Sequence, residues 1–191
     1  DHFRTSWIYG PRGRHRRPSH RNIGEDMTIS HLIATFFYVG HLRPAPGTWG
    51  SAVAIPVAWA LHVLGGPWLL GAGVILSFAL GWWATSLETK GKTDHDPSEI
   101  VIDEVAGQWL AFLPVSIGAA HVGVPLTALY PGWIAAFLLF RLFDIWKPGP
   151  VGWADRRGDS LGVMLDDILA GVIAAVGVIA LAALSHGVLM N

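Results

Sequence analysis

The sequence predicts an all-α protein: a compact polytopic bundle of about five transmembrane spans, with an N-terminal segment that is re-entrant or interfacial. Of its 191 residues, 52% are hydrophobic and only 14% are charged, whereas about 25% are charged in an average soluble domain. Three long stretches contain no Asp, Glu, Lys or Arg: residues 51–87, 105–140 and 168–191. Each is long enough for a crossing of roughly 20 residues. A soluble helical protein would need charge on its exposed faces, so a membrane protein is favoured.

The first 26 residues differ from the rest of the chain. They carry six arginines in a polar stretch containing Gly and Pro, and they lack the apolar core of a signal peptide. We predict a disordered basic extension over residues 1–26, ahead of a membrane-embedded domain over residues 27–191. Two alternatives are a tail that binds anionic lipid headgroups and sequence that precedes a true start at Met27.

The apolar stretches and the turn signals between them place the individual spans. Residues 29–39 are apolar but too few to cross, which favours an interfacial or re-entrant segment. Gly65-Gly66-Pro67 indicates a turn between the first two spans, and residues 121–125 indicate another. The predicted crossings are residues 51–64, 68–87, 105–120, 126–143 and 168–184.

The lysines and arginines then orient the bundle. Lys90 and Lys92, and further along Lys147, Arg156 and Arg157, all fall on one side of the five-span arrangement, and the intervening turns carry none. The positive-inside rule therefore places the polar loops in the cytoplasm. Three segments, residues 46–51, 94–104 and 144–167, are expected to meet at this membrane face.

Acidic residues are concentrated in these segments. The first group is Asp94, Asp96, Glu99, Asp103 and Glu104, and the second contains Asp144, Asp155, Asp166 and Asp167 together with Arg141 and Lys147. Glu99 and Asp103 are four residues apart and would share a helix face. Such acids often only form ion pairs at helix ends. So many at one boundary, however, repel one another unless a cation neutralises them.

The residue types limit the chemistry at this face. There is no cysteine, which excludes thiolate metal sites and cysteine nucleophiles, and the histidine spacing matches no zinc pattern. Oxygen ligands together with substrate phosphate are typical of Mg²⁺ sites. Arg141 and Lys147 are candidates for clamping phosphate oxygens, and Thr48 and Ser51 offer further donors to an anion.

Four sequence blocks resemble the phosphatidylglycerophosphatase A family. They occupy residues 46–51 (PGTWGS), 96–107 (DPSEIVIDEVAG), 140–150 (FRLFDIWKPGP) and 162–171 (GVMLDDILAG), in the family's order. The chain departs from the family pattern at Gly149 and at Asp159-Ser160. The resemblance implies a multi-pass enzyme of the bacterial inner membrane that uses Mg²⁺ to convert phosphatidylglycerophosphate into phosphatidylglycerol, with its site facing the cytoplasm.

The expected partners are the substrate phosphatidylglycerophosphate and membrane lipids, and no nucleic acid is expected. The resemblance and the residue chemistry together suggest the following roles. The predicted metal ligands are Glu99, Asp103, Glu104, Asp144 and Asp167. The predicted phosphate-binding residues are Thr48, Ser51, Arg141 and Lys147, and the predicted catalytic residues are Asp96, Asp103, Lys147 and Asp166. Asp96 or Asp166 would act as general base or as covalent nucleophile.

Two rival functions fit the sequence less well. Another enzyme of phospholipid metabolism, such as a phosphotransferase using a nucleotide-activated lipid, would be expected to carry a repeated Asp-Gly pattern, which is missing. A cation transporter using the same acids would place them near the middle of its spans, yet the long spans are free of charge. The sequence predicts no oligomeric state.

Overall fold

The structure is a computed structural model that describes residues 29–189, so the predicted basic extension lies outside the described residues. Within the described range every regular element is helical, which confirms the all-α prediction. The elements in chain order are α1 (Ile29–Ala34), the 3-10 helix η1 (Val39–His41), α2 (Pro46–Glu88), α3 (Ile102–Val122), the 3-10 helix η2 (Leu126–Leu129), α4 (Tyr130–Trp146), α5 (Pro150–Asp155) and α6 (Ser160–Leu189).

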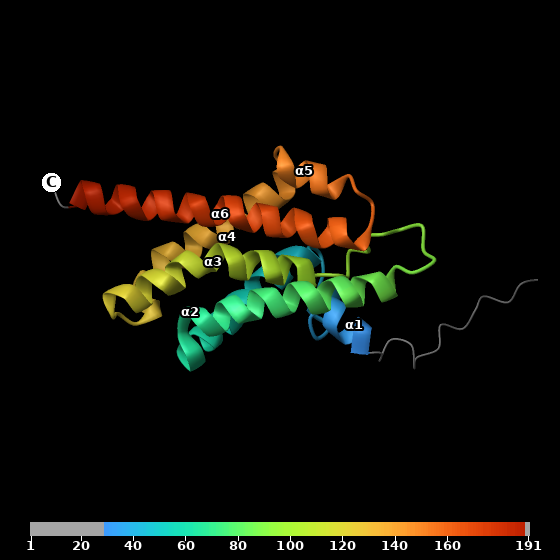
Figure 1. The fold of residues 1–191 in the computed structure, drawn as a ribbon, viewed down its shortest axis with the longest axis horizontal. Helices are drawn as coiled ribbons and strands as arrows, with labels where there is room; N and C mark the ends of the chain where they lie inside the picture. Colours follow the sequence, from blue (N-terminus) through green and yellow to red (C-terminus); the bar gives the residue numbers. More distant parts are fainter. Residues whose placement is uncertain (1–28, 190–191) are drawn as a thin grey trace, which may run out of the picture.

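Helix α2 supplies the first two predicted spans as one folded-back pair of arms. Its 43 residues are interrupted at Gly65 and Gly66, whose backbone angles are not helical. Gly66 has φ 63 and ψ −158, a combination that glycine adopts far more readily than other residues. Figure 1 shows the chain turning back on itself at this point. The first arm begins at Pro46 instead of Ser51, so it is longer than the predicted span.

The other apolar helices complete the bundle. Four described helical stretches are long and apolar enough to cross a membrane, and because α2 folds back, they provide the five apolar arms that the sequence predicts. With six residues, α1 is too short to cross, as expected. Helix α6 begins at Ser160, eight residues earlier than predicted, because the Asp159 carboxylate accepts the backbone N–H of Gly162 at 2.8 Å and caps the helix.

This earlier start corrects one detail of the sequence analysis. Asp166 and Asp167 do not open the last span but lie about two turns inside α6. Helix α3 likewise begins only at Ile102, so Glu99 precedes it and does not share a helix face with Asp103. These two helix starts decide which carboxylates of α3 and α6 can lie close together.

Helix α3 is the centre of the bundle and packs against both α2 and α6. A Cβ atom on Gly171 of α6 would collide with the backbone of Gly107 in α3, so the two helices approach through glycines. Several polar groups between the spans find internal partners, as a bilayer favours. The Trp109 indole N–H, for example, donates to the Ala54 carbonyl at 2.8 Å.

The helix connections divide between the two ends of the bundle. In Figure 1, α1, the loop before α3 and the start of α6 lie at one end, whereas the turn of α2 and the last described turns of α6 lie at the other. Segments far apart in the sequence therefore deliver their polar residues to one end, as predicted.

Candidate active site

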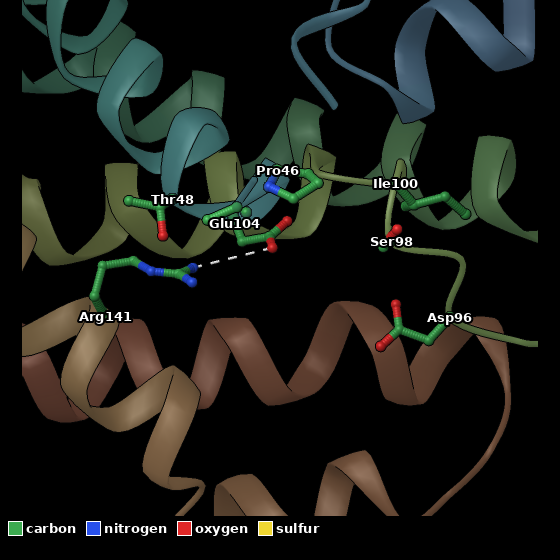
Figure 2. A pocket seen from close by; sticks show the side chains of 9 residues that line it. Pro46, Thr48, Asp96, Ser98, Ile100, Glu104 and Arg141 are labelled. Carbon is green, nitrogen blue, oxygen red and sulfur yellow. Dashed lines mark ion pairs between the residues drawn. The ribbon is translucent and has the colours of Figure 1, made fainter. Parts of the chain in front are cut away.

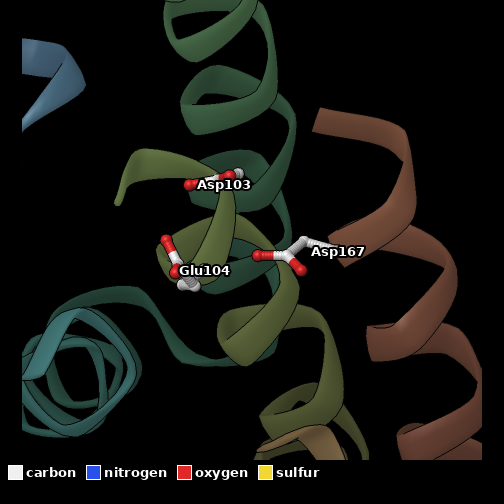
Figure 3. A group of neighbouring side chains, drawn as sticks. All are labelled: Asp103, Glu104 and Asp167. Carbon is white, nitrogen blue, oxygen red and sulfur yellow. The ribbon is translucent and has the colours of Figure 1, made fainter. Parts of the chain in front are cut away.

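Three carboxylates from two helices converge near the polar end of the bundle. Asp103 and Glu104 belong to the first turn of α3, and Asp167 comes from α6. One oxygen from each lies within 4.8 Å of the others, and Figure 3 shows the Asp167 side chain directed towards the two α3 residues. We call Asp103, Glu104 and Asp167 the carboxylate trio.

The trio is buried and incompletely hydrogen-bonded. Asp103 is 6% exposed and Asp167 is 3% exposed. Asp103 Oδ1 and Glu104 Oε2 accept no hydrogen bond within the described part of the chain. Carboxylates removed from water in this way are costly unless a cation or a donor compensates them. The trio therefore has the oxygen ligands of a metal-ion site, and its buried negative charge lacks a compensating donor. It can hold a metal ion.

Glycines allow the trio to form. A Cβ on Gly107, one turn after the trio residues of α3, would collide with the Asp167 backbone carbonyl and with the Phe140 ring. A Cβ on Gly47, near the start of α2, would collide with the Glu104 carboxylate. The sequence thus keeps side chains out of the two places where neighbouring elements approach the acids.

A second group of charges is organised by Lys147, immediately after α4. Lys147 has a left-handed backbone conformation with φ 51, which ends the helix and turns the chain towards α5. Its ammonium group donates to Asp166 Oδ2 at 2.8 Å and also to Asp155. Burial lowers the pKa of Lys147, but the hydrogen bonds to Asp155 and Asp166 outweigh that effect and raise the pKa above its ordinary value.

Asp166 connects the Lys147 group to the trio. Its Oδ2 accepts from Lys147, and its Oδ1 accepts the backbone N–H of Asp167 at 3.0 Å. Both oxygens of Asp166 are therefore engaged. Because Asp166 and Asp167 are consecutive in α6, the two groups of charges lie side by side.

Arg141 of α4 binds protein carboxylates. Its guanidinium lies 2.5 Å from Asp144 Oδ2 and 4.0 Å from Glu104 Oε1, and it donates a long hydrogen bond of 3.4 Å to Ser51 Oγ. Ser51 is fully buried and donates to the Gly47 carbonyl at 2.9 Å. Arg141 thus contacts the acids, and Ser51 contacts the start of α2. That either side chain binds phosphate stays a prediction.

A polar pocket of about 300 Å³ opens beside the trio. Figure 2 shows Arg141 and Thr48 towards one end and Asp96 at the other, with Glu104 between them. Asp96 lies on the loop before α3, where its backbone N–H donates to the Asp94 carboxylate at 3.1 Å. Partial burial raises the pKa of Asp96, Lys147 opposes the rise, and the Asp155 carboxylate adds to it.

The structure brings most of the predicted site residues together, but not all of them. Glu99 lies outside the trio, and its backbone carbonyl packs closely against Gly40. Sequence reasoning did not assign a role to Ser98, which lines the pocket, or to Gln108, which is fully buried with no hydrogen-bond partner for its amide within the described residues. Gln108 could have been recognised from the sequence, because it is a polar residue one turn after Glu104 in an otherwise apolar span.

The charges around this site are unbalanced. Six carboxylates lie in the trio, the Lys147 group and the pocket lining, and Asp144 beside Arg141 is a seventh. Among the described residues, Arg141 and Lys147 are the two cations that pair with members of this set. An anionic phosphate would be repelled by such a site unless further positive charge entered with it. The arrangement is therefore suited to a cation and a phosphate that bind together.

Comparison with known proteins agrees with this chemistry. The sequence profile of the family described as phosphatidylglycerophosphatase A matches residues 32–182. The chain belongs to the phosphatidylglycerophosphatase A family. It is thus a phosphatase, and the trio, the Lys147 group and the pocket all fall inside the matched range.

Relatives in three bacteria are similar over most of their length. The chain is 34% identical to the phosphatidylglycerophosphatase A of Escherichia coli K12, over 83% of this chain and 88% of the relative. It is 35% identical to that of Haemophilus influenzae, over 79% and 87%. It is 37% identical to a Bacteroides thetaiotaomicron protein named "Putative phosphatidylinositol-3-phosphatase", over 74% and 86%. No solved structure matches the chain.

Proposed function

We propose that this family member is a Mg²⁺-dependent phosphatase of the bacterial inner membrane that hydrolyses phosphatidylglycerophosphate to phosphatidylglycerol and phosphate. The carboxylate trio carries the proposal: three acids from two helices, two of them almost fully buried, with oxygens that lack hydrogen-bond partners among the described residues. A purely structural cluster of this kind would destabilise the bundle. A cation that meets a phosphate there explains why the acids are placed together.

The donor set favours Mg²⁺ over softer metals. All three trio ligands are carboxylate oxygens, and the neighbouring Asp144 is a fourth, held by Arg141. Hard cations prefer such oxygens, and Mg²⁺ is commonly bound by a few carboxylates together with substrate phosphate. When bound, Mg²⁺ supplies positive charge that offsets the charge of the phosphate.

We assign Lys147 to stabilise the transferred phosphoryl group. Its two carboxylate partners, Asp155 and Asp166, fix the position of the ammonium and raise its pKa, so Lys147 is charged at neutral pH. A positioned cation at the point where charge develops lowers the barrier to phosphoryl transfer. Thr48, on the pocket wall in the first turn of α2, adds a hydroxyl donor.

Asp96 is the better candidate for moving a proton. Both oxygens of Asp166 are occupied by Lys147 and by the Asp167 backbone N–H, whereas the Asp96 carboxylate lines the open pocket. Its pKa is raised by partial burial, and a pKa closer to the working pH suits a general base. We therefore assign Asp96 to take a proton from the attacking water.

The orientation follows from the charged loops. Lys90 and Lys92 are exposed in the loop that follows α2, and this loop lies at the end of the bundle where α6 begins (Figure 1). Arg156 is exposed directly after α5, and an excess of such residues marks the cytoplasmic side. The acyl chains of the lipid would remain beside the apolar helix faces, and only the headgroup would enter the pocket.

Phosphate release by the purified full-length chain tests this function. We expect Mg²⁺-dependent release from phosphatidylglycerophosphate that stops on chelation, and loss of turnover in Asp103→Asn and Lys147→Ala variants that remain folded. Glu99→Gln is the matched control, because Glu99 lies outside the trio, and it should retain activity. Hydrolysis without added divalent cation would contradict the proposed role of the trio.

A second substrate belongs in the same assay. The name of the 37% identical Bacteroides relative refers to phosphatidylinositol-3-phosphate, so this lipid is the most informative competitor. Faster hydrolysis of phosphatidylinositol-3-phosphate than of phosphatidylglycerophosphate would overturn the substrate assignment, while leaving the phosphatase chemistry intact.

A further inference from the structure

A cluster of imidazoles and a carboxylate lies outside the active site, between the N-terminal segment and the end of α2. His31 belongs to α1, His41 to η1 and Glu88 to the last turn of α2. The Nε2 atoms of His31 and His41 are 3.1 Å apart. None of these residues contributes to the trio, the Lys147 group or the pocket lining.

We propose that His31 and His41 form a binding site for a transition-metal ion such as Zn²⁺, with water completing the coordination. Tetrahedral Zn²⁺ holds imidazole nitrogens at about 2.0–2.1 Å, which places two such nitrogens roughly 3.3–3.4 Å apart. The separation of the two Nε2 atoms is already within a few tenths of an ångström of that value. Little rearrangement is needed to admit the ion between them.

The surroundings of His31 match the second coordination shell of a metal-binding histidine. Its other ring nitrogen, Nδ1, lies 3.3 Å from Glu88 Oε2, and Ser30 Oγ donates to Glu88 Oε1 at 2.8 Å. Histidine ligands commonly donate the second ring N–H to a carboxylate, which fixes the tautomer and makes the ligating nitrogen more basic. Glu88 therefore directs the Nε2 lone pair of His31 towards His41.

The tautomers of the two rings are compatible with metal binding. With Nδ1–H donated to Glu88, neutral His31 presents a lone pair at Nε2, and in the absence of metal His41 donates its Nε2–H to that lone pair. His41 is exposed, so its ring can lose the Nε2 proton and gain one at Nδ1 through water. Both Nε2 atoms then offer lone pairs to one ion, with no net change in bound protons.

The ligand types separate this site from the carboxylate trio. Imidazole nitrogens favour Zn²⁺, Cu²⁺ or Ni²⁺, whereas carboxylate oxygens and water favour Mg²⁺. One chain would thus bind two kinds of ion at two places, and excess Mg²⁺ would occupy the trio without competing at the histidines.

The location gives such an ion a structural role. The Val101 N–H donates to the Ala34 carbonyl at 2.9 Å, and Gly40 lies against the backbone of Glu99. These contacts join the N-terminal segment to the loop that carries Asp96. An ion held by His31 and His41 would therefore fasten α1 and η1 next to one wall of the active-site pocket.

Calorimetric titration of the detergent-solubilised full chain with ZnCl₂, in saturating Mg²⁺, tests the proposal. His2, His15 and His20 are first replaced by alanine, so that the first 28 residues contribute no imidazole. We expect one Zn²⁺ per chain, loss of that binding in His41→Ala, and unchanged binding in His95→Ala, which removes an exposed histidine elsewhere. Glu88→Gln should weaken binding by about tenfold or more, the usual effect of losing a carboxylate behind a ligand.

A spectroscopic measurement separates metal ligation from a merely structural histidine pair. Cu²⁺ bound at the same stoichiometry should show nitrogen coupling in its electron paramagnetic resonance spectrum, and that coupling should vanish in His41→Ala. Thermal unfolding without added metal checks that this variant is folded. No Zn²⁺ binding in the parent chain, or Zn²⁺ binding that survives His41→Ala, would overturn the proposal.

Discussion

Asp103→Asn offers the sharpest test of the carboxylate trio, because asparagine keeps the shape of the side chain and removes only its charge. Asp103 is 6% exposed and lies within 4.8 Å of an oxygen of each trio partner. At an effective dielectric constant of about 20, two unit charges 4.8 Å apart repel by roughly 3.5 kcal/mol. The folded, metal-free protein therefore carries a repulsion that this variant relieves.

The measured gain should be smaller than that pairwise value. Interacting acids share protons, so the metal-free cluster relieves part of its own repulsion by staying partly protonated. We expect Asp103→Asn to stabilise the metal-free protein by on the order of 1–3 kcal/mol. For a chain of this size, each kcal/mol corresponds to about 2–4 °C in the unfolding midpoint.

Magnesium should stabilise the parent protein but not the Asp103→Asn variant. A ligand that binds only the folded state stabilises it in proportion to the logarithm of its concentration over Kd, so Mg²⁺ should raise the parent's midpoint and barely move that of Asp103→Asn. The ten tryptophans make intrinsic fluorescence a direct readout, with Glu99→Gln as the control that keeps the parental response. A lower midpoint for metal-free Asp103→Asn, together with a preserved Mg²⁺ shift, would refute the reasoning.

Three further variants probe the rest of the site. Lys147→Met removes the cation between Asp155 and Asp166 and should lower kcat by about 10²–10³-fold, measured by phosphate release; a kcat within threefold of the parent would contradict this role. Gly47→Ala pushes a methyl group into the Glu104 carboxylate and should raise the Mg²⁺ concentration needed for half-maximal activity. Because the pKa of Asp96 is raised on folding, its contribution to stability is lost as the pH rises through that pKa. Asp96→Asn should therefore be inactive yet unfold at a higher temperature than the parent at neutral pH, with the difference vanishing in acid.

Much of the fold follows from the distribution of charge along the chain. The gaps in charge located the described helices that are long and apolar enough to cross a membrane. Gly65-Gly66 marked the fold in α2, because a flexible backbone is needed to turn so sharply there. The ends of the helices were harder to predict from the sequence, because a helix in a membrane protein can continue beyond its apolar stretch where a capping residue is present. Asp159 extends α6 backwards in this way, and no apolar pattern would have signalled it.

The sequence indicated which types of residue gather at the candidate site, but not which of the acids lie next to one another. Counting acids at one membrane face identified the trio residues, yet nothing in the spacing distinguishes Asp103 from Glu99 as a partner of Asp167. The deciding contacts are the close approaches at Gly47 and Gly107, which depend on how α2, α3 and α6 pack. For the same reason Arg141, predicted to hold phosphate, is found beside Asp144 and Glu104.

The imbalance of charge at the site has a consequence for how the enzyme binds its ligands. Under the proposed function, the seven carboxylates and two paired cations would repel the phosphate in the absence of Mg²⁺. The acids would also retain Mg²⁺ better when a phosphate shares its charge. Each ligand should therefore raise the affinity of the other by the same factor, because coupling between two binding equilibria is reciprocal. A lipid without a phosphomonoester would gain little from the ion, so the acids that position the metal would also exclude the ordinary phospholipids that surround the protein.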